Sequence, residues 1–219
     1  MQFRTKIALA LCLCLSSLAW AQSRAPAQLL ERLRQMDVEH HWLAGAARVD
    51  WQTGDPRPGA PPHDHRSTHC SAFVASACQQ LGVYILRPPE HSSTLLANAQ
   101  CSWLGSAEGL RAGWTRLNSA SEARNAANQG QLVVGAYQSA HSDKPGHIAI
   151  VIPSAWTDER VRREGCEIMQ AGSHNYLSTS LKQGFHQHRG AFARGMIQFY
   201  AHQLPQGQTG PIQPGARKI

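Results

Sequence analysis

Residues 70–82 read CSAFVASACQQLG, and this stretch decides the first half of the fold. Its apolar side chains recur three or four residues apart, at Cys70, Phe73, Val74, Ala77 and Leu81. This spacing places them on one face of a helix. Ser67 or Thr68 is positioned to cap the start of that helix, and Gly82 can adopt the left-handed conformation that ends it. The sequence therefore predicts a helix over residues 70–81 with one buried face.

Beyond this helix the pattern changes to short runs rich in β-branched and aromatic residues. These runs cover residues 132–137, 147–152, 166–171 and 196–202, and turn-forming stretches separate them. They predict antiparallel strands. Residues 27–36 have helical spacing, and Ser119 with Glu122 forms a capping box ahead of a short helix that Gly130 closes. Helices before strands indicate an α+β domain, with its helices packed on one face of an antiparallel sheet.

Both ends of the chain have the composition of segments outside the folded domain. Residues 1–21 carry a basic start, an apolar run and the small-residue ending Ala19-Trp20-Ala21, as in a cleavable secretory signal. The apolar run has about 12 residues, whereas a membrane span needs roughly 20. Residues 22–62 are expected to form a helix and a Pro/Gly-rich loop, 63–203 the main domain, and 204–219 a disordered tail. We therefore expect a periplasmic or secreted protein without a membrane span.

The composition limits the possible partners. The chain has 219 residues, a net charge of +7 from 21 basic and 14 acidic side chains, 42% hydrophobic residues and only 16% charged ones. These values fit one globular domain and exclude an acidic disordered chain or a long coiled coil. The basic residues are scattered, so nucleic acid is not an expected partner. The positive charge favours a polyanionic surface such as a cell wall.

Four cysteines remain beyond the expected signal, namely Cys70, Cys78, Cys101 and Cys166. An oxidising compartment permits disulfides. If one thiol is catalytic, three remain, and we expect Cys101 to pair with Cys166 or with Cys78. The alternative is that all four cysteines are bridged, which would make the protein a non-catalytic secreted binding module.

Cys70 has the position of a nucleophile, because it opens the predicted helix. Unpaired N–H groups and the positive end of the helix dipole lower the pKa of a thiol placed there. His147 starts an apolar strand directly after Pro145-Gly146 and is the candidate base. Pairing of strands 147–152 and 166–171 puts His147 opposite Gln170 or Ala171. The Gln170 side chain can then orient the imidazole, with Asn175 as the second candidate for this role.

These residues resemble those of a known family. Cys70-Ser71-Ala72-Phe73-Val74 and Gly146-His147-Ile148-Ala149-Ile150-Val151 are similar to the nucleophile helix and the base strand of NlpC-like and CHAP cysteine peptidases. The resemblance covers about residues 60–202. It implies a papain-like fold and hydrolysis of an amide bond in peptidoglycan, by a stem-peptide endopeptidase or an N-acetylmuramoyl-L-alanine amidase. It also implies Cys70 as nucleophile, His147 as base, Gln170 as orienter, and no cofactor.

Other residues leave alternatives open. His63, His65 and His69 crowd one loop and could ligate zinc, which would make the protein a zinc-dependent amidase. Trp103 and Trp114 could stack on a substrate or pack in the core. An antibacterial effector with a cognate inhibitor protein and a housekeeping wall enzyme would share all of these residues.

Overall fold

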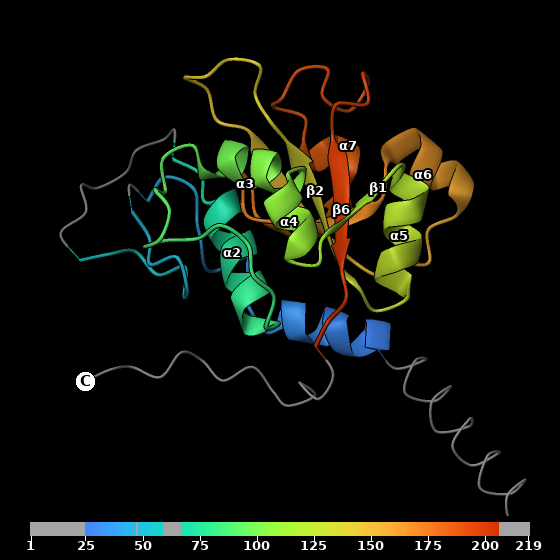
Figure 1. Cartoon of the computed structure of the whole chain (residues 1–219), viewed down its shortest axis with the longest axis horizontal. Coiled ribbons are helices and arrows are strands. Elements are labelled where there is room, and N and C mark those ends of the chain that lie inside the picture. Colours follow the sequence, from blue (N-terminus) through green and yellow to red (C-terminus); the bar gives the residue numbers. More distant parts are fainter. Residues whose placement is uncertain (1–24, 47, 59–66, 206–219) are drawn as a thin grey trace, which may run out of the picture.

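The structure, a computed structural model, describes residues 25–46, 48–58 and 67–205 (Figure 1). The expected signal at 1–21 lies outside the described residues, as do His63 and His65. The expected tail lies outside them from residue 206 onward.

The first half of the chain is helical, as the apolar spacing predicts. A helix over residues 25–34 is followed by α2 (Cys70–Gln80), α3 (Leu96–Leu104) and α4 (Ala107–Arg111). Gly82 has a φ of 72°, the left-handed conformation expected just after α2. The N-cap of α2 is His69 rather than Ser67 or Thr68, and its side chain makes no capping hydrogen bond. The prediction of a hydroxyl cap was therefore wrong.

The second half contributes all six strands of an antiparallel sheet. Its strands and short helices are β1 (Thr115–Leu117), α5 (Ala120–Asn128), β2 (Leu132–Tyr137), β3 (His147–Val151), α6 (Asp158–Glu164), β4 (Glu167–Gln170), β5 (Tyr176–Ser180), α7 (Leu181–Gly184) and β6 (Gln198–His202). The six strands lie in the order β1-β6-β2-β3-β4-β5. The capping box ahead of α5 is confirmed, because the Ser119 hydroxyl accepts a hydrogen bond from the Glu122 N–H at 3.1 Å.

The α+β class is confirmed, but helices cover both faces of the sheet. One face packs against α2, α3 and the N-terminal helix, through Leu29 and Leu33 of that helix. The other face packs against α5 and α7, as Leu181 and Phe185 show. The reason is that every residue of β3 and nearly every residue of β2 is buried, so both sides of these strands need apolar cover. The expectation of a single covered face was wrong.

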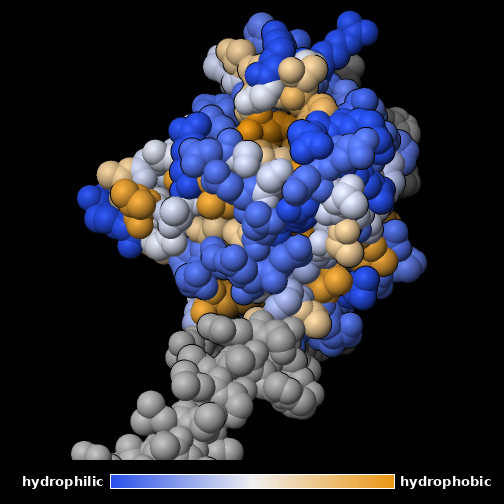
Figure 2. Space-filling model, turned by 90° about the vertical axis from the view of Figure 1, so that its right-hand side faces the viewer, coloured by the Kyte–Doolittle hydropathy of each residue, from blue (hydrophilic) through white to orange (hydrophobic). Residues whose placement is uncertain are grey.

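The surface over α5 and α6 is mostly hydrophilic, with hydrophobic residues scattered in small groups (Figure 2). In the part of the chain that the structure describes, the large hydrophobic side chains that stand exposed are Leu43 and Leu110. No helix among these residues is both long and apolar enough to cross a membrane.

Candidate active site

Cys70 is the first residue of α2, and the packing of α2 fixes its position. The helix buries Phe73, Val74 and Ala77 in the core shared with α3 and the sheet. Its first turn is also tied to α3, because the Gln100 side-chain amide donates to Ser71 O at 3.1 Å and to Leu86 O at 2.9 Å. The helix start is therefore held in one place at the edge of β3.

The thiol occupies a place where two strands separate. The ladder between β3 and β4 pairs Val151 with Ile168 and Ile150 with Met169, and its register ends there. Backbone N–H groups of alternate residues point to the same neighbouring strand, so the Ile148 N–H points toward the β4 side beyond that last pair. This N–H donates to the thiol sulfur of Cys70. Cys70 therefore contacts the residue that directly follows His147.

His147 is hydrogen bonded to Gln170, as expected, but the predicted register was wrong. The ladder pairs Ile150 with Met169, a register that puts Gly172 rather than Gln170 or Ala171 level with His147. The distance between His147 Nε2 and Gln170 Oε1 is 2.9 Å, and both side chains are buried, at 5% and 2% exposed. The Gln170 amide nitrogen donates to His174 O at 3.1 Å, so the amide oxygen is the atom that faces the ring. An amide oxygen only accepts, and Nε2 must therefore carry the proton. Nδ1 of His147 is left with a free lone pair.

Burial controls the protonation of both groups. Loss of solvation lowers the pKa of His147 to about 4, against a smaller opposite effect from the Gln170 hydrogen bond. Burial raises the pKa of the Cys70 thiol, and the N–H groups of Ile148, Ser71 and Cys70 itself lower it by less. The expected low thiol pKa was therefore wrong, because desolvation outweighs the helix start. At neutral pH the structure holds a thiol and a neutral imidazole.

Two aromatic rings cover His147 on the face of the sheet opposite α2. Phe185 meets the imidazole edge to face with 4.6 Å between ring centroids, and His188 stacks on it at 5.5 Å and 22°. Desolvation and the neighbouring His147 and His186 lower the pKa of His188 to about 4. The proximity of His188 to His147 arises from the chain path after α7, and no local motif indicates it.

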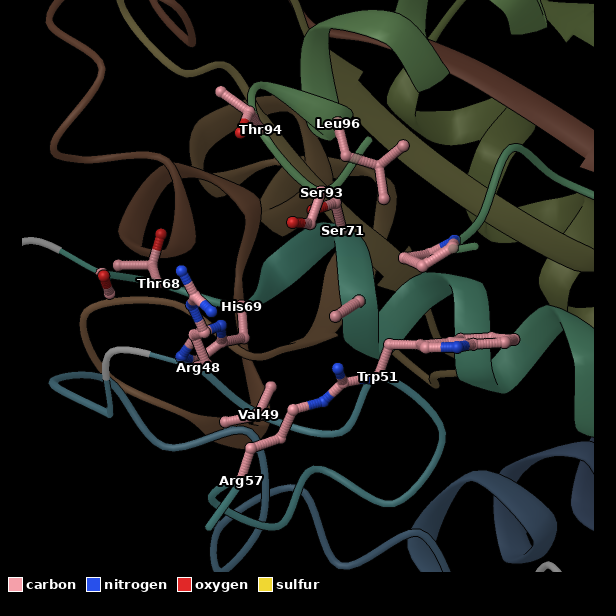
Figure 3. Close-up of a pocket in the computed structure, with 13 residues that line it drawn as sticks. Arg48, Val49, Trp51, Arg57, Thr68, His69, Ser71, Ser93, Thr94 and Leu96 are labelled. Atoms are coloured by element: carbon pink, nitrogen blue, oxygen red, sulfur yellow. The ribbon is translucent and has the colours of Figure 1, made fainter. Parts of the chain in front are cut away.

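A groove of about 520 Å³ lies beside the first turn of α2, where Ser71 and Ala72 form part of its lining. One side is the turn around the isolated bridge between Val49 and Pro56, and the other is the segment 88–96 (Figure 3). Trp51 lines this groove, and it belongs to the segment 22–62 that was expected to form a helix and a Pro/Gly-rich loop. The groove therefore runs past the residue next to Cys70.

The three further candidate site residues, Trp103, Trp114 and Asn175, which were predicted as substrate-binding residues, do not line this groove. Trp114 is 1% exposed and its indole donates to Tyr84 O at 2.9 Å, so it is a core residue and cannot stack on a ligand. Trp103 is half-buried and packs edge to face against Tyr84. Asn175 donates to Val38 O at 2.6 Å and to His41 O at 2.8 Å. Asn175 thus anchors the N-terminal segment and does not contact His147.

The expected disulfide is absent. Among the residues that the structure describes, all four cysteines are free and buried. Cys78 and Cys101 lie in the core between α2, α3 and the sheet, whereas Cys166 lies in the core on the other face. The sheet separates Cys101 from Cys166, so this pairing was wrong. The pairing of Cys101 with Cys78 is not formed either.

Residues 25–46, 48–58 and 67–205 contain no group of three or more His, Cys, Asp or Glu side chains that could hold a metal ion. His69 Nε2 donates to Ala46 O at 2.8 Å, and burial lowers its pKa. The zinc alternative also needs His63 and His65, which lie outside the described residues.

Neither the protein-family models nor the curated proteins contain a match to this chain.

Proposed function

We propose that the chain is a papain-like cysteine hydrolase that cleaves an amide bond in peptidoglycan. The observation that carries the proposal is the fixed tautomer of His147. Gln170 holds Nε2 in the protonated form, so Nδ1 is free to take a proton, and the Cys70 thiol contacts the next residue of the same strand. The Cys70 sulfur thus lies at the backbone of the strand that carries His147. Catalysis requires the imidazole, which faces the other side of the sheet with Phe185 and Gln170, to reach that sulfur at the opening between β3 and β4.

The chemistry starts from a neutral pair. His147 Nδ1 takes the proton of the Cys70 thiol as the sulfur attacks the amide carbonyl carbon. The C–N bond then breaks, the imidazolium gives its proton to the leaving amine, and a thioester remains on Cys70. Water attacks the thioester with His147 as base, which releases the carboxylic acid and restores the thiol. Because the pKa values of the two groups lie on opposite sides of neutrality, thiol deprotonation occurs with attack rather than before it.

The start of α2 supplies donors for the developing oxyanion. His69 gives the helix no side-chain cap, and the N–H groups of Cys70 and Ser71 point to the Cys70 sulfur, where the substrate carbonyl would be attacked. Preorganised backbone donors of this kind stabilise a negative oxygen in a tetrahedral intermediate. We assign this role to the N–H groups of Cys70 and Ser71.

The substrate class rests on the family resemblance of the two motifs and on the positive charge of the chain. A peptidoglycan substrate implies action in the periplasm or outside the cell, which is the destination that the expected signal at 1–21 provides. A cognate inhibitor protein belongs to the proposal only if the enzyme is an antibacterial effector.

Digestion of purified peptidoglycan tests the proposal. Wild type, Cys70→Ala and Cys78→Ala are incubated with the polymer, and the soluble fragments are analysed by mass spectrometry. Cys78 is the matched control, since it is a second buried thiol of α2 that lies two turns further along. Wild type and Cys78→Ala are expected to release the same new termini, and Cys70→Ala to release none. The masses identify the bond that is cut.

Two outcomes would contradict the proposal. Equal release by wild type and Cys70→Ala would remove Cys70 from the chemistry. Inactivation by a chelator, with full activity of Cys70→Ala, would favour the zinc-dependent amidase. The module with every cysteine bridged would need two disulfides, whereas Cys70, Cys78, Cys101 and Cys166 are free thiols in the structure.

A further inference from the structure

The groove beside α2 has walls that are held firmly. One wall is the turn around the Val49–Pro56 bridge, which we call the hairpin wall. It is tied to α2, because the Ser76 hydroxyl donates to Gln52 O at 2.6 Å. The same wall is tied to the core by the Trp42 indole, which donates to Trp51 O at 3.1 Å. The groove of about 520 Å³ is thus a feature of the packed fold.

The charged side chains that line the groove are both cationic. They are Arg48 and Arg57, and Figure 3 shows both on the hairpin side. Arg57 has a long ion pair with Asp50, at 3.9 Å between exposed groups, and such a pair contributes little. Within the described residues Arg48 has no ion pair, and no acidic side chain lines the groove. His69 also lines the groove, and it is neutral at pH 7 because burial lowers its pKa.

The rest of the lining completes a site for a polar, anionic ligand. Hydroxyl groups come from the start of α2 and from the opposite wall, where Figure 3 shows Ser93 and Thr94. Trp51 adds an apolar surface. Guanidinium groups bind carboxylates with two parallel hydrogen bonds, and hydroxyl groups can donate to the remaining lone pairs.

We propose that this groove binds a free carboxylate of the peptide that is cleaved, and that Arg48 and Arg57 are the residues that recognise it. The inference rests on the proposed function, because it places the peptide in the groove that passes Ser71, next to the Cys70 thiol. It adds a selection rule, namely that a peptide with a free carboxylate binds better than the same peptide with that group amidated.

Binding is measured apart from cleavage with the Cys70→Ala protein. A fluorescently labelled stem peptide with free carboxylates and its fully amidated counterpart are titrated by fluorescence anisotropy. We expect the free acid to bind about tenfold more tightly, as one charge-assisted contact provides. Arg48→Gln and Arg57→Gln are each expected to remove most of this preference and to leave binding of the amidated peptide unchanged.

Arg162→Gln is the matched control. Arg162 lies on α6, across the molecule from α2, and this substitution removes the same charge from the surface (Figure 1). Equal affinity of Cys70→Ala for the two peptides would overturn the proposal, as would an equal loss in Arg162→Gln. If discrimination is found but the wild-type protein cuts no bond, the groove stands and the proposed hydrolase fails. If the wild type cuts the peptides but Cys70→Ala binds the free acid and the amidated peptide equally well, the hydrolase stands and the proposed role of the groove fails.

Discussion

Replacement of Gly184 by alanine is expected to break the hydrogen bond between His147 and Gln170, because the new methyl group on α7 would collide with the Gln170 side chain. A Cβ at position 184 would lie 2.5 Å from Gln170 Oε1, whereas ordinary contact begins at 3.4 Å. The amide oxygen must then move by about 0.5 Å to reach the closest contact that Cβ atoms show, and by about 0.9 Å to reach ordinary contact. The hydrogen bond from His147 Nε2 is 2.9 Å long and cannot survive a shift of that size.

The energetic effect has two parts. Overpacking against Gln170 and Ile168 costs about 1–3 kcal/mol of folding free energy, and the lost hydrogen bond about 1 kcal/mol more. Cleavage is expected to fall roughly 100-fold, because a base displaced by about 1 Å no longer meets the thiol and the carbonyl correctly. Neither effect requires a change to any residue assigned to the chemistry.

Three measurements test this reasoning, with Gly135→Ala as the control. They are urea unfolding, peptidoglycan cleavage and the ¹⁵N shifts of the His147 ring, which report its tautomer. A Cβ at Gly135 meets its neighbours in ordinary contact, at 3.4 Å or more, so alanine there should add about 0.5–1 kcal/mol to strand stability. If Gly184→Ala keeps wild-type stability, a single Nε2–H tautomer and full cleavage, the packing argument is refuted.

Three further predictions concern stability and the thiols. Lowering the pH from 7 to 4 should cost about 3 kcal/mol through His147, because its folded pKa lies near 4, below the ordinary 6.5, and the unfolded chain takes up the proton first. Above pH 6.5 His147 is mostly neutral in both the folded and the unfolded chain, so this cost is nearly absent there. In urea titrations, the unfolding free energy of His147→Asn should therefore fall by about 3 kcal/mol less than that of the wild type between pH 7 and pH 4. Asn175→Ala should cost about 2 kcal/mol in thermal unfolding, because it removes two part-buried hydrogen bonds to backbone carbonyls. If the folded variant also lost cleavage, Asn175 would act in the site rather than as an anchor. Alkylation of denatured, unreduced protein should label Cys70, Cys78, Cys101 and Cys166. A protected pair would contradict the free thiols.

Local pattern was enough to predict several elements and one side-chain contact. The helix after His69, the capped helix α5 and the strands β2, β3, β4 and β6 follow from periodicity and turn residues, which act over a few positions. The His147–Gln170 contact could also be predicted, because Gln170 is the polar residue of the neighbouring strand, although the exact register of that strand was not predicted correctly. Short strands such as β1 and β5 carried too little pattern to be recognised.

Tertiary packing decided the properties that depend on distant segments. The pKa of Cys70 follows from its burial between α2 and the sheet, and local helix electrostatics gave the wrong direction. Three such properties join residues far apart in the chain. They are the burial of Trp114 in the core, the stacking of His188 on His147, and the cationic groove at Arg48. Solvation and shape depend on every segment that packs around a group. Residue order alone therefore determined which side chains were available for chemistry, and the packed fold decided their protonation, their neighbours and the surface beside them.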